Sequence, residues 1–155
     1  VTTPRAELSR TDFAPFRELR DMPLAMTAHV VFSAIDAERP ASTSARVTED
    51  VIRGEIGFDG LLMSDDLSMR ALSGSIGERA AAVIAAGSDV ALHCNGDLAE
   101  MEAAAEAVPR LAGKAAERFS AAVARVGRVR PFDRAAAVAK LSQVLADHAA
   151  SIESV

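Results

Sequence analysis

The sequence predicts an α/β fold built on a small parallel sheet, and two patterns lead to this class. Short apolar runs at 24–32, 60–63 and 89–92 alternate with segments whose apolar residues recur at helical spacing. Strands that alternate with helices form βαβ units, which have right-handed crossovers and parallel strands. After the third run, only helical segments follow. Three strands do not close a barrel, so the pattern indicates either a small open sheet or a part of something larger.

Turn and capping residues set the boundaries of the expected elements. Thr11 and Asp12 could cap the first helix, and Pro23 prevents its continuation. Ser44 is the expected N-cap of the second helix, which Gly57 ends. In chain order, the sequence predicts a helix over 13–19, a strand over 24–32, a helix over 44–56, a strand over 60–63, a helix over 77–86, a strand over 89–92, helices over 98–108 and 115–126, and a last helix that runs to about 149, before a frayed tail, 151–155.

Length and composition are those of a soluble globular protein. The chain has 155 residues, of which half are hydrophobic and a quarter are charged. Its net charge of −5 argues against a nucleic-acid partner, and the single cysteine, Cys94, excludes an internal disulfide framework. No stretch is long and apolar enough to span a membrane, and the start lacks a signal-peptide pattern. The prediction is a cytoplasmic protein with no nucleic-acid or membrane partner.

Unusual polar residues stand at the carboxyl end of each expected strand. They are His29 on the first strand, Asp65 on the second, and His93 with Asn95 on the third. In α/β folds the carboxyl ends of parallel strands face the ligand crevice, because the connecting loops gather there. Three such positions at one edge of a sheet predict a site.

Two interpretations of the adjacent acids Asp65 and Asp66 are open. In the first, they cap the next helix or accept hydrogen bonds from turn amides. In the second, one acid acts in catalysis and the other supports it. Adjacent residues at a strand end point in different directions, so the two acids are not a facing acid/base pair. A metal site made by His29, His93 and Asp65 is conceivable, but their spacing carries no metal signature. The sequence therefore predicts neither a metal nor a cofactor.

Several motifs carry a family resemblance. They are AMTAHV at 25–30, GFDG at 57–60 followed by SDDLSM at 64–69, and AGSD at 86–89, with DFAPFR at 12–17 before them. Together they resemble the bacterial β-N-acetylhexosaminidases of glycoside hydrolase family 3. The resemblance extends from about residue 4 to about residue 130, and the GFDG and SDDLSM block is its most specific part.

The resemblance implies a fold and an activity. The family folds as a (β/α)8 barrel, of which this chain would supply the last three strands and their helices as a domain over 1–130, followed by a C-terminal helix and tail over 131–155. Such enzymes release terminal β-linked N-acetylglucosamine from peptidoglycan fragments in cytoplasmic cell-wall recycling, without metal or cofactor. The family's nucleophile matches Asp65, and Asp66 would hydrogen-bond the loop.

The resemblance also suggests two substrate-binding residues. Met69 would pack near the sugar, although a methionine at such a position is most often a core residue. His29 would either line the sugar pocket or be a half-buried histidine that is hydrogen-bonded at a strand end. His93 and Cys94 are expected to be structural.

The sequence departs from the family pattern in one respect. The family's acid/base is a histidine in a KHFPGHG-like block upstream of what matches residue 1, and this chain contains no such block. The expectation is therefore a C-terminal part of a glycosidase that is inactive alone. The alternative is a catalytically incomplete α/β fragment that acts by self-association or partner binding, because a partial barrel exposes strand edges.

Overall fold

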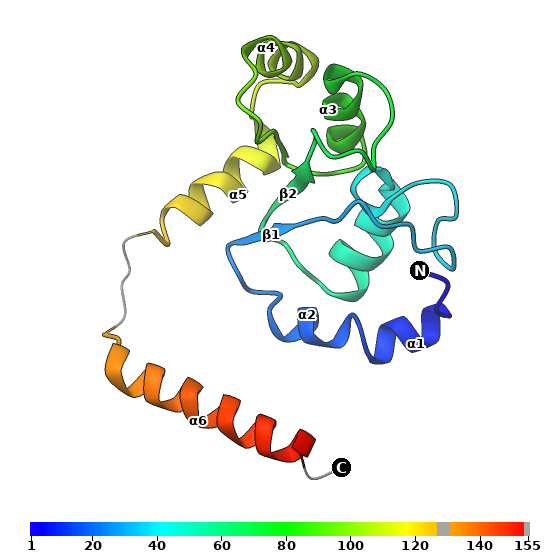
Figure 1. Ribbon diagram of the computed structural model, residues 1–155. Helices are drawn as coiled ribbons and strands as arrows, with labels where there is room; N and C mark the ends of the chain where they lie inside the picture. The colour runs from blue at the N-terminus through cyan, green and yellow to red at the C-terminus, as the bar shows by residue number, and fades with distance from the viewer. Residues whose placement is uncertain (127–130, 154–155) are drawn as a thin grey trace. The chain divides into compact units, whose positions relative to one another are not determined.

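The computed structural model describes residues 1–126 and 131–153, which belong to two compact units, Val1–Arg125 and Val126–Val155 (Figure 1). The second unit contains one long helix, α6 (Arg134–Glu153). The boundary predicted from the sequence lies after residue 130. The predicted frayed tail over 151–155 is wrong for residues 151–153, which continue α6, and residues 154 and 155 lie outside the described residues.

The first unit is built on the predicted three-stranded parallel sheet. Its strands are β1 (Leu24–Met26), β2 (Leu61–Asp66) and β3 (Val90–Leu92), in the order β1-β2-β3. Ala25 pairs with Leu62 in β1 and β2, and the pairing of β2 with β3 contains an irregularity between Met63 and Asp66. The central strand thus carries the two acids at its carboxyl end, with one parallel neighbour on each side.

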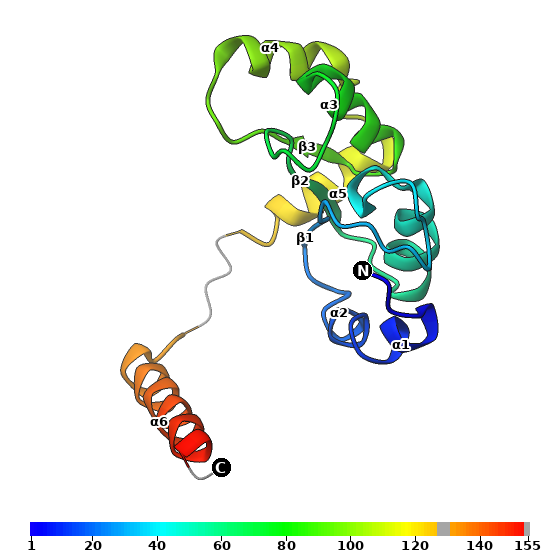
Figure 2. The ribbon, with the colours of Figure 1, turned by 45° about the vertical axis from the view of Figure 1, so that its right-hand side comes forward.

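Helices connect the strands in the predicted order, and Figure 2 shows β3 beside β2, with α3 and α4 next to each other. An additional short helix that the sequence analysis did not predict begins the chain. In chain order, the helices of this unit are α1 (Arg5–Arg10), α2 (Ala14–Glu18), the 3-10 turn η1 (Ala41–Thr43), the π-helical η2 (Val47–Glu55), α3 (Ile76–Ala85), α4 (Leu98–Ala107) and α5 (Gly113–Val123).

Two hydrophobic clusters pack the helices against the sheet. The first cluster includes Leu8, Val51 and Leu62, which are at most 2 % exposed and come from α1, η2 and β2. The second cluster includes the fully buried Leu67 and Val83 and packs α3 and α4 beside the sheet. The interior is therefore mostly aliphatic, with Phe13 and Phe58 as buried aromatic members of the first cluster.

The predicted strand over 24–32 was too long. After Thr27, whose N–H donates to the carbonyl of Met63, the chain leaves the sheet. The carbonyls of Ala28 and Val30 accept hydrogen bonds from the backbone of 41–42 instead of from β2. These apolar residues are therefore held by a loop, because their backbone groups find partners outside the sheet.

Of the N-caps predicted for the first two helices, the first is wrong and the second is confirmed. Thr11 and Asp12 bond to each other, and the Thr11 hydroxyl donates to the Glu7 carbonyl, so they end α1 rather than cap α2. Ser44 does accept a hydrogen bond from the N–H of Val47 at 3.2 Å, as its predicted N-cap role requires. The predicted helix over 44–56 is wound mainly as a π-helix.

A buried ion-pair network fixes the amino ends of β2 and β3. The carboxylate of Asp89 is 5 % exposed and accepts hydrogen bonds from Arg53 at 2.9 Å, from Arg118 at 3.0 Å and from the N–H of Leu62 at 2.8 Å. Arg53 also donates to the carbonyls of Phe58 and Gly60. This network connects η2, α5 and both strands at the end of the sheet opposite the predicted site.

Among the described residues, no helix combines the length and the apolar character needed to cross a lipid bilayer.

Candidate active site

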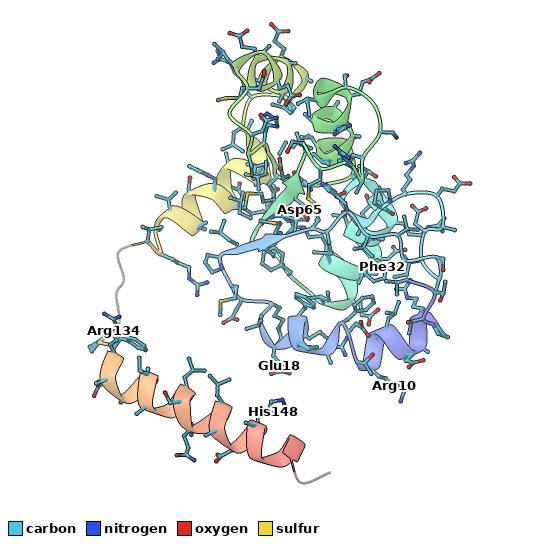
Figure 3. All side chains as sticks on the ribbon, viewed as in Figure 1. Arg10, Glu18, Phe32, Asp65, Arg134 and His148 are labelled. Atoms are coloured by element: carbon cyan, nitrogen blue, oxygen red, sulfur yellow. The ribbon has the colours of Figure 1, made fainter. Side chains whose placement is uncertain are left out.

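Asp65 lies at the carboxyl end of β2 and is partly exposed (Figure 3). Side chains alternate along a strand, so Asp65 shares a face with Met63, while Ser64 and Leu62 lie on the opposite face. Burial agrees with this assignment, because Ser64 is 0 % exposed and Leu62 is 1 % exposed. The strand is thus anchored from one side and presents Asp65 on the other.

The carboxylate of Asp65 has one partner in the described part of the chain. Its Oδ1 accepts the backbone N–H of Asp66 at 2.8 Å, and Oδ2 receives no hydrogen bond from any described residue. Next to it, the Ser64 hydroxyl donates to the Asp65 carbonyl at 2.8 Å and accepts the N–H of Leu92 at 3.0 Å. One carboxylate oxygen is therefore fixed, and the other remains able to contact a ligand.

The carboxylate of Asp66 accepts several hydrogen bonds from other residues of the chain. Its carboxylate accepts the hydroxyl of Ser68, the N–H of Ser68 at 3.0 Å and the N–H of Cys94 at 3.1 Å. The hydrogen bond from the Ser68 hydroxyl is the main reason why the pKa of Asp66 is lowered, with further contributions from the two backbone donors and from His93, against a smaller opposing effect of burial. Asp66 is therefore a charged structural group that ties the loops after β2 and β3 together.

His29 is half-buried and uses both ring nitrogens within the chain. Nε2 lies 2.9 Å from the carbonyl oxygen of Asp66, and Nδ1 lies 2.6 Å from the hydroxyl of Ser42. A carbonyl oxygen only accepts hydrogen bonds, so Nε2 carries the proton. The structure thus brings His29 together with Asp66, and with Ser42, which is 1 % exposed.

Met69 belongs to the loop that follows β2, and its side chain is 42 % exposed. Arg79 of α3 holds this loop, because Nη1 donates to the carbonyl of Leu67 at 2.7 Å and to that of Met69 at 3.2 Å, and Nε donates to that of Gly74 at 3.0 Å. The loop that carries Met69 is therefore fixed to α3 near the two acids.

The residues after β3 divide between structural and exposed positions. The side chain of His93 is 7 % exposed, and its Nε2 lies 3.3 Å from Glu100 Oε2, with no ring hydrogen bond among the described residues. Cys94 is exposed; desolvation of its thiol and then the charges of Asp66 and Asp65 raise its pKa.

The chemistry available at this end of the sheet is that of one accessible carboxylate. Within the described ranges, no three histidine, cysteine or acidic side chains are grouped so that they could hold a metal ion. Ser42, Ser68 and Arg79 were not among the predicted site residues. Ser68, two residues after Asp66, carried the signal of an Asx-type turn, whereas Ser42 and Arg79 had no local signal, because they act on distant segments.

Comparison with known proteins gives one family. The family described as "Glycosyl hydrolase family 3 N terminal domain" matches residues 1–129. The β-hexosaminidase of Bordetella avium is 35% identical over 157 residues, which cover 96% of this chain and 41% of that protein. The β-hexosaminidase of Bordetella pertussis is 42% identical over 101 residues, which cover 63% of this chain and 28% of that protein. The chain thus spans less than half the length of these curated relatives.

Solved structures agree with the sequence comparison. A glycoside hydrolase family 3 β-N-acetylglucosaminidase from Paenibacillus sp. str. FPU-7 superposes with a TM-score of 0.72 at 30% identity, covering 86% of this chain and 29% of that chain. NagZ from Neisseria gonorrhoeae superposes with a TM-score of 0.68 at 32% identity, covering 79% of this chain and 35% of that chain.

Proposed function

Because the chain belongs to glycosyl hydrolase family 3, we propose that it is the part of a retaining β-N-acetylglucosaminidase that carries the nucleophile, Asp65. The observation that carries this proposal is the state of Asp65 at the carboxyl end of the central strand. One of its oxygens is fixed by a backbone N–H and the other has no partner in the described residues. A nucleophilic carboxylate needs this combination of orientation and access.

The three strands would be the last three of a (β/α)8 barrel, with residues 1–130 as the barrel part and 131–155 as a C-terminal helix and tail. In support, β1, β2 and β3 are consecutive, parallel and connected by helices, as in such barrels. Asp65 lies at the carboxyl ends of the strands, where barrel enzymes have their active sites.

In the proposed reaction, Asp65 attacks the anomeric carbon of the terminal sugar and forms a covalent glycosyl–enzyme ester. The bond between that carbon and the leaving oxygen breaks, and a general acid from outside this chain gives the oxygen a proton. Water, deprotonated by the same group, then attacks the anomeric carbon and releases Asp65 as a carboxylate. This route retains the anomeric configuration and uses neither metal nor cofactor.

The proposed substrate is a peptidoglycan fragment or disaccharide with a terminal β-linked N-acetylglucosamine, processed in the cytoplasm during cell-wall recycling. The exposed Met69, held beside the acids by Arg79, is proposed to pack against the sugar. A contact of His29 with the sugar stays a prediction. Only the carbon edge of the His29 ring is available for it, because both nitrogens have partners.

The test is hydrolysis of a chromogenic N-acetyl-β-glucosaminide by two proteins. The first is this chain, which is expected to show no turnover. The second is this chain fused to the upstream part of the Bordetella avium relative, which is expected to be active. In the fusion, Asp65→Asn should lower kcat at least about 1,000-fold, because the covalent step is lost.

Glu106→Gln is the control, since it removes the same charge at an exposed position of α4 and should leave kcat unchanged. The nucleophile assignment makes one further prediction: azide should restore glycosyl transfer to an inactive Asp65→Gly fusion by replacing the missing carboxylate. A fusion that keeps full activity with Asp65→Asn would exclude this role.

A second candidate function is self-association or partner binding by an incomplete α/β fragment. The observation in its favour is the outer edge of β1, where Leu24 and Met26 are 50 % and 53 % exposed. Beside them is an apolar groove of about 310 Å³, lined by residues of α2, β1 and η2. Sedimentation of the chain over a range of concentrations tests this candidate, and a monomer at all concentrations would argue against self-association.

A further inference from the structure

We propose that His29 and Ser42 are positioning residues that orient the nucleophile Asp65 through the backbone of Asp66. This inference rests on the proposed function, because it concerns the same carboxylate. Neither residue needs to touch the sugar for this role. A series of hydrogen bonds leads from a buried serine on η1 to the carboxylate at the end of β2.

The protons in this series have only one consistent arrangement for the neutral ring. The Asp66 carbonyl requires a donor, so Nε2 of His29 is protonated and Nδ1 is the acceptor. The hydroxyl of Ser42 then donates to Nδ1 at 2.6 Å. Since Ser42 is 1 % exposed, water does not compete for this hydrogen bond, and the buried hydroxyl holds the ring in the tautomer that the Asp66 carbonyl requires.

Asp66 is the residue through which this tautomer acts on Asp65. The carbonyl of Asp66 accepts hydrogen bonds from His29 at 2.9 Å and from the N–H of Met69 at 3.2 Å, and its carboxylate is held by Ser68 and by the N–H of Cys94. With both of these groups fixed, the backbone rotations of Asp66 have little freedom left. The N–H of Asp66 therefore keeps its orientation toward Oδ1 of Asp65, to which it donates a hydrogen bond at 2.8 Å.

The placement of the residues excludes a direct contact between the His29 ring nitrogens and Asp65. Both nitrogens already have partners, and Asp65 lies on the opposite face of β2 from Ser64. The exit of β1 and η1 are thus linked through His29 to the backbone carbonyl of Asp66, whose N–H, in the preceding peptide group, bonds the carboxylate of Asp65. A residue that fixes a catalytic group in this way contributes by preorganisation.

The first test needs no variant and no activity. Nitrogen-15 NMR of the His29 ring in this chain is expected to show the neutral tautomer with the proton on Nε2 at pH 7.5. A proton on Nδ1, or an average of both tautomers, would overturn the proposal. In Ser42→Ala, the Asp66 carbonyl still requires the Nε2 proton, so the tautomer is expected to stay while the Nδ1 signal shifts on loss of its donor. Ser44→Ala is the matched control: this buried serine bonds Asp36 and Val47, so its removal should leave both His29 ring signals unchanged.

The second test separates positioning from general stability. Hydrogen exchange of the Asp66 N–H should become about tenfold faster in His29→Leu, which loses the donor, and stay near the wild-type rate in His29→Gln, which keeps an N–H at a similar distance. The amides of α3 serve as the internal reference. An unchanged Asp66 N–H, or an equal acceleration in α3, would overturn the positioning role.

Kinetics in the fusion protein complete the test. His29→Leu is expected to lower kcat about tenfold at an unchanged KM, and His29→Gln should recover most of this loss. A rise in KM at an unchanged kcat would instead assign His29 to sugar binding. If the wild-type fusion is inactive, the proposed function fails, whereas the two NMR measurements still decide whether His29 holds Asp66.

Discussion

At the scale of single residues, two adjacent acids with the same chemistry have different environments. Asp65 receives one backbone hydrogen bond, whereas the Asp66 carboxylate receives three hydrogen bonds from Ser68 and Cys94. The difference follows from strand alternation, which directs the two side chains to opposite faces of β2. An acid with many donors is held as a structural anion, and an acid with few keeps an oxygen for a ligand.

The lowered pKa of Asp66 gives a pH-dependent prediction. A carboxyl whose pKa is lower in the folded than in the unfolded state stabilises the fold above its unfolded pKa, and this contribution is lost as the pH falls through the folded pKa. Asp66→Asn should therefore reduce the free energy of unfolding by about 1–2 kcal/mol at pH 6. The difference from the wild type should shrink below about pH 4.

Urea unfolding of both proteins between pH 3 and pH 6 measures this effect. Asp65→Asn is the control, and it should change stability by less than about 0.5 kcal/mol at pH 6, as expected for a side chain with a single hydrogen bond. A difference between Asp66→Asn and the wild type that persists unchanged at pH 3 would contradict the prediction.

At the scale of secondary-structure elements, the two ends of the sheet carry different kinds of side chains and interactions. The carboxyl ends carry Asp65 and the loops around it, while the amino ends carry the ion-pair network of Asp89, Arg53 and Arg118. In parallel α/β folds, residues at the amino ends contribute to stability and those at the carboxyl ends to function. The contacts in this chain follow the same division.

Asp89→Ala tests the stability role of the amino ends. The substitution leaves two arginines, each with a side chain 17 % exposed, without their shared carboxylate. Removing one member of a buried ion-pair network typically costs about 3–5 kcal/mol. Asp59→Ala is the matched control: its side chain is 67 % exposed, so its salt bridges with Arg118 and Lys114 should contribute less than about 1 kcal/mol. Equal losses in urea unfolding for both variants would contradict this assignment.

The short helix α1 is expected to be part of the core rather than a frayed end. Its Leu8 is fully buried in the first hydrophobic cluster. Leu8→Ala should therefore lower the free energy of unfolding by about 2–5 kcal/mol, through lost burial and the remaining cavity. Leu19→Ala, at a position 50 % exposed, should lower the free energy of unfolding much less. Thermal unfolding of both variants measures the difference. Similar melting temperatures for the two variants would show that α1 does not pack as described.

At the scale of the whole molecule, the sheet of the first unit ends in two strands that each have one neighbour. Among the described residues, β1 pairs only with β2, and its exposed apolar side chains help to line the apolar groove. Unpaired strand edges of this kind favour association with another strand. The chain also covers less than half of the curated relatives, so most of their length has no counterpart here.

A charge on this edge tests the alternative function. If the chain associates through β1, Met26→Lys should shift it toward the monomer in sedimentation experiments, because natural edge strands use lysine to prevent pairing. Met101→Lys is the control, since Met101 is 47 % exposed on α4, away from the β1 edge. An identical distribution of masses in both variants would exclude association through β1.

The order of strands and helices was determined by the sequence, because hydrophobic period, glycine and proline are local signals. The family motif placed Asp65 by the same local means, and the structure put it at the end of β2. The lengths of the strands and helices were harder to predict from the sequence. The strand expected over 24–32 ends at Met26, because the carbonyls beyond it bond the 41–42 backbone rather than the sheet.

Only the tertiary structure decided what the site residues do. Asp66 and His29 are 37 positions apart, and His29 and Ser42 are 13 apart, so no local pattern reports that they share hydrogen bonds. The register of parallel strands sets these contacts, and a shift of one residue would move every side chain to the other face. The sequence thus supplied the chemical groups and their order, and the packing of distant segments assigned one acid to structure and left the other accessible.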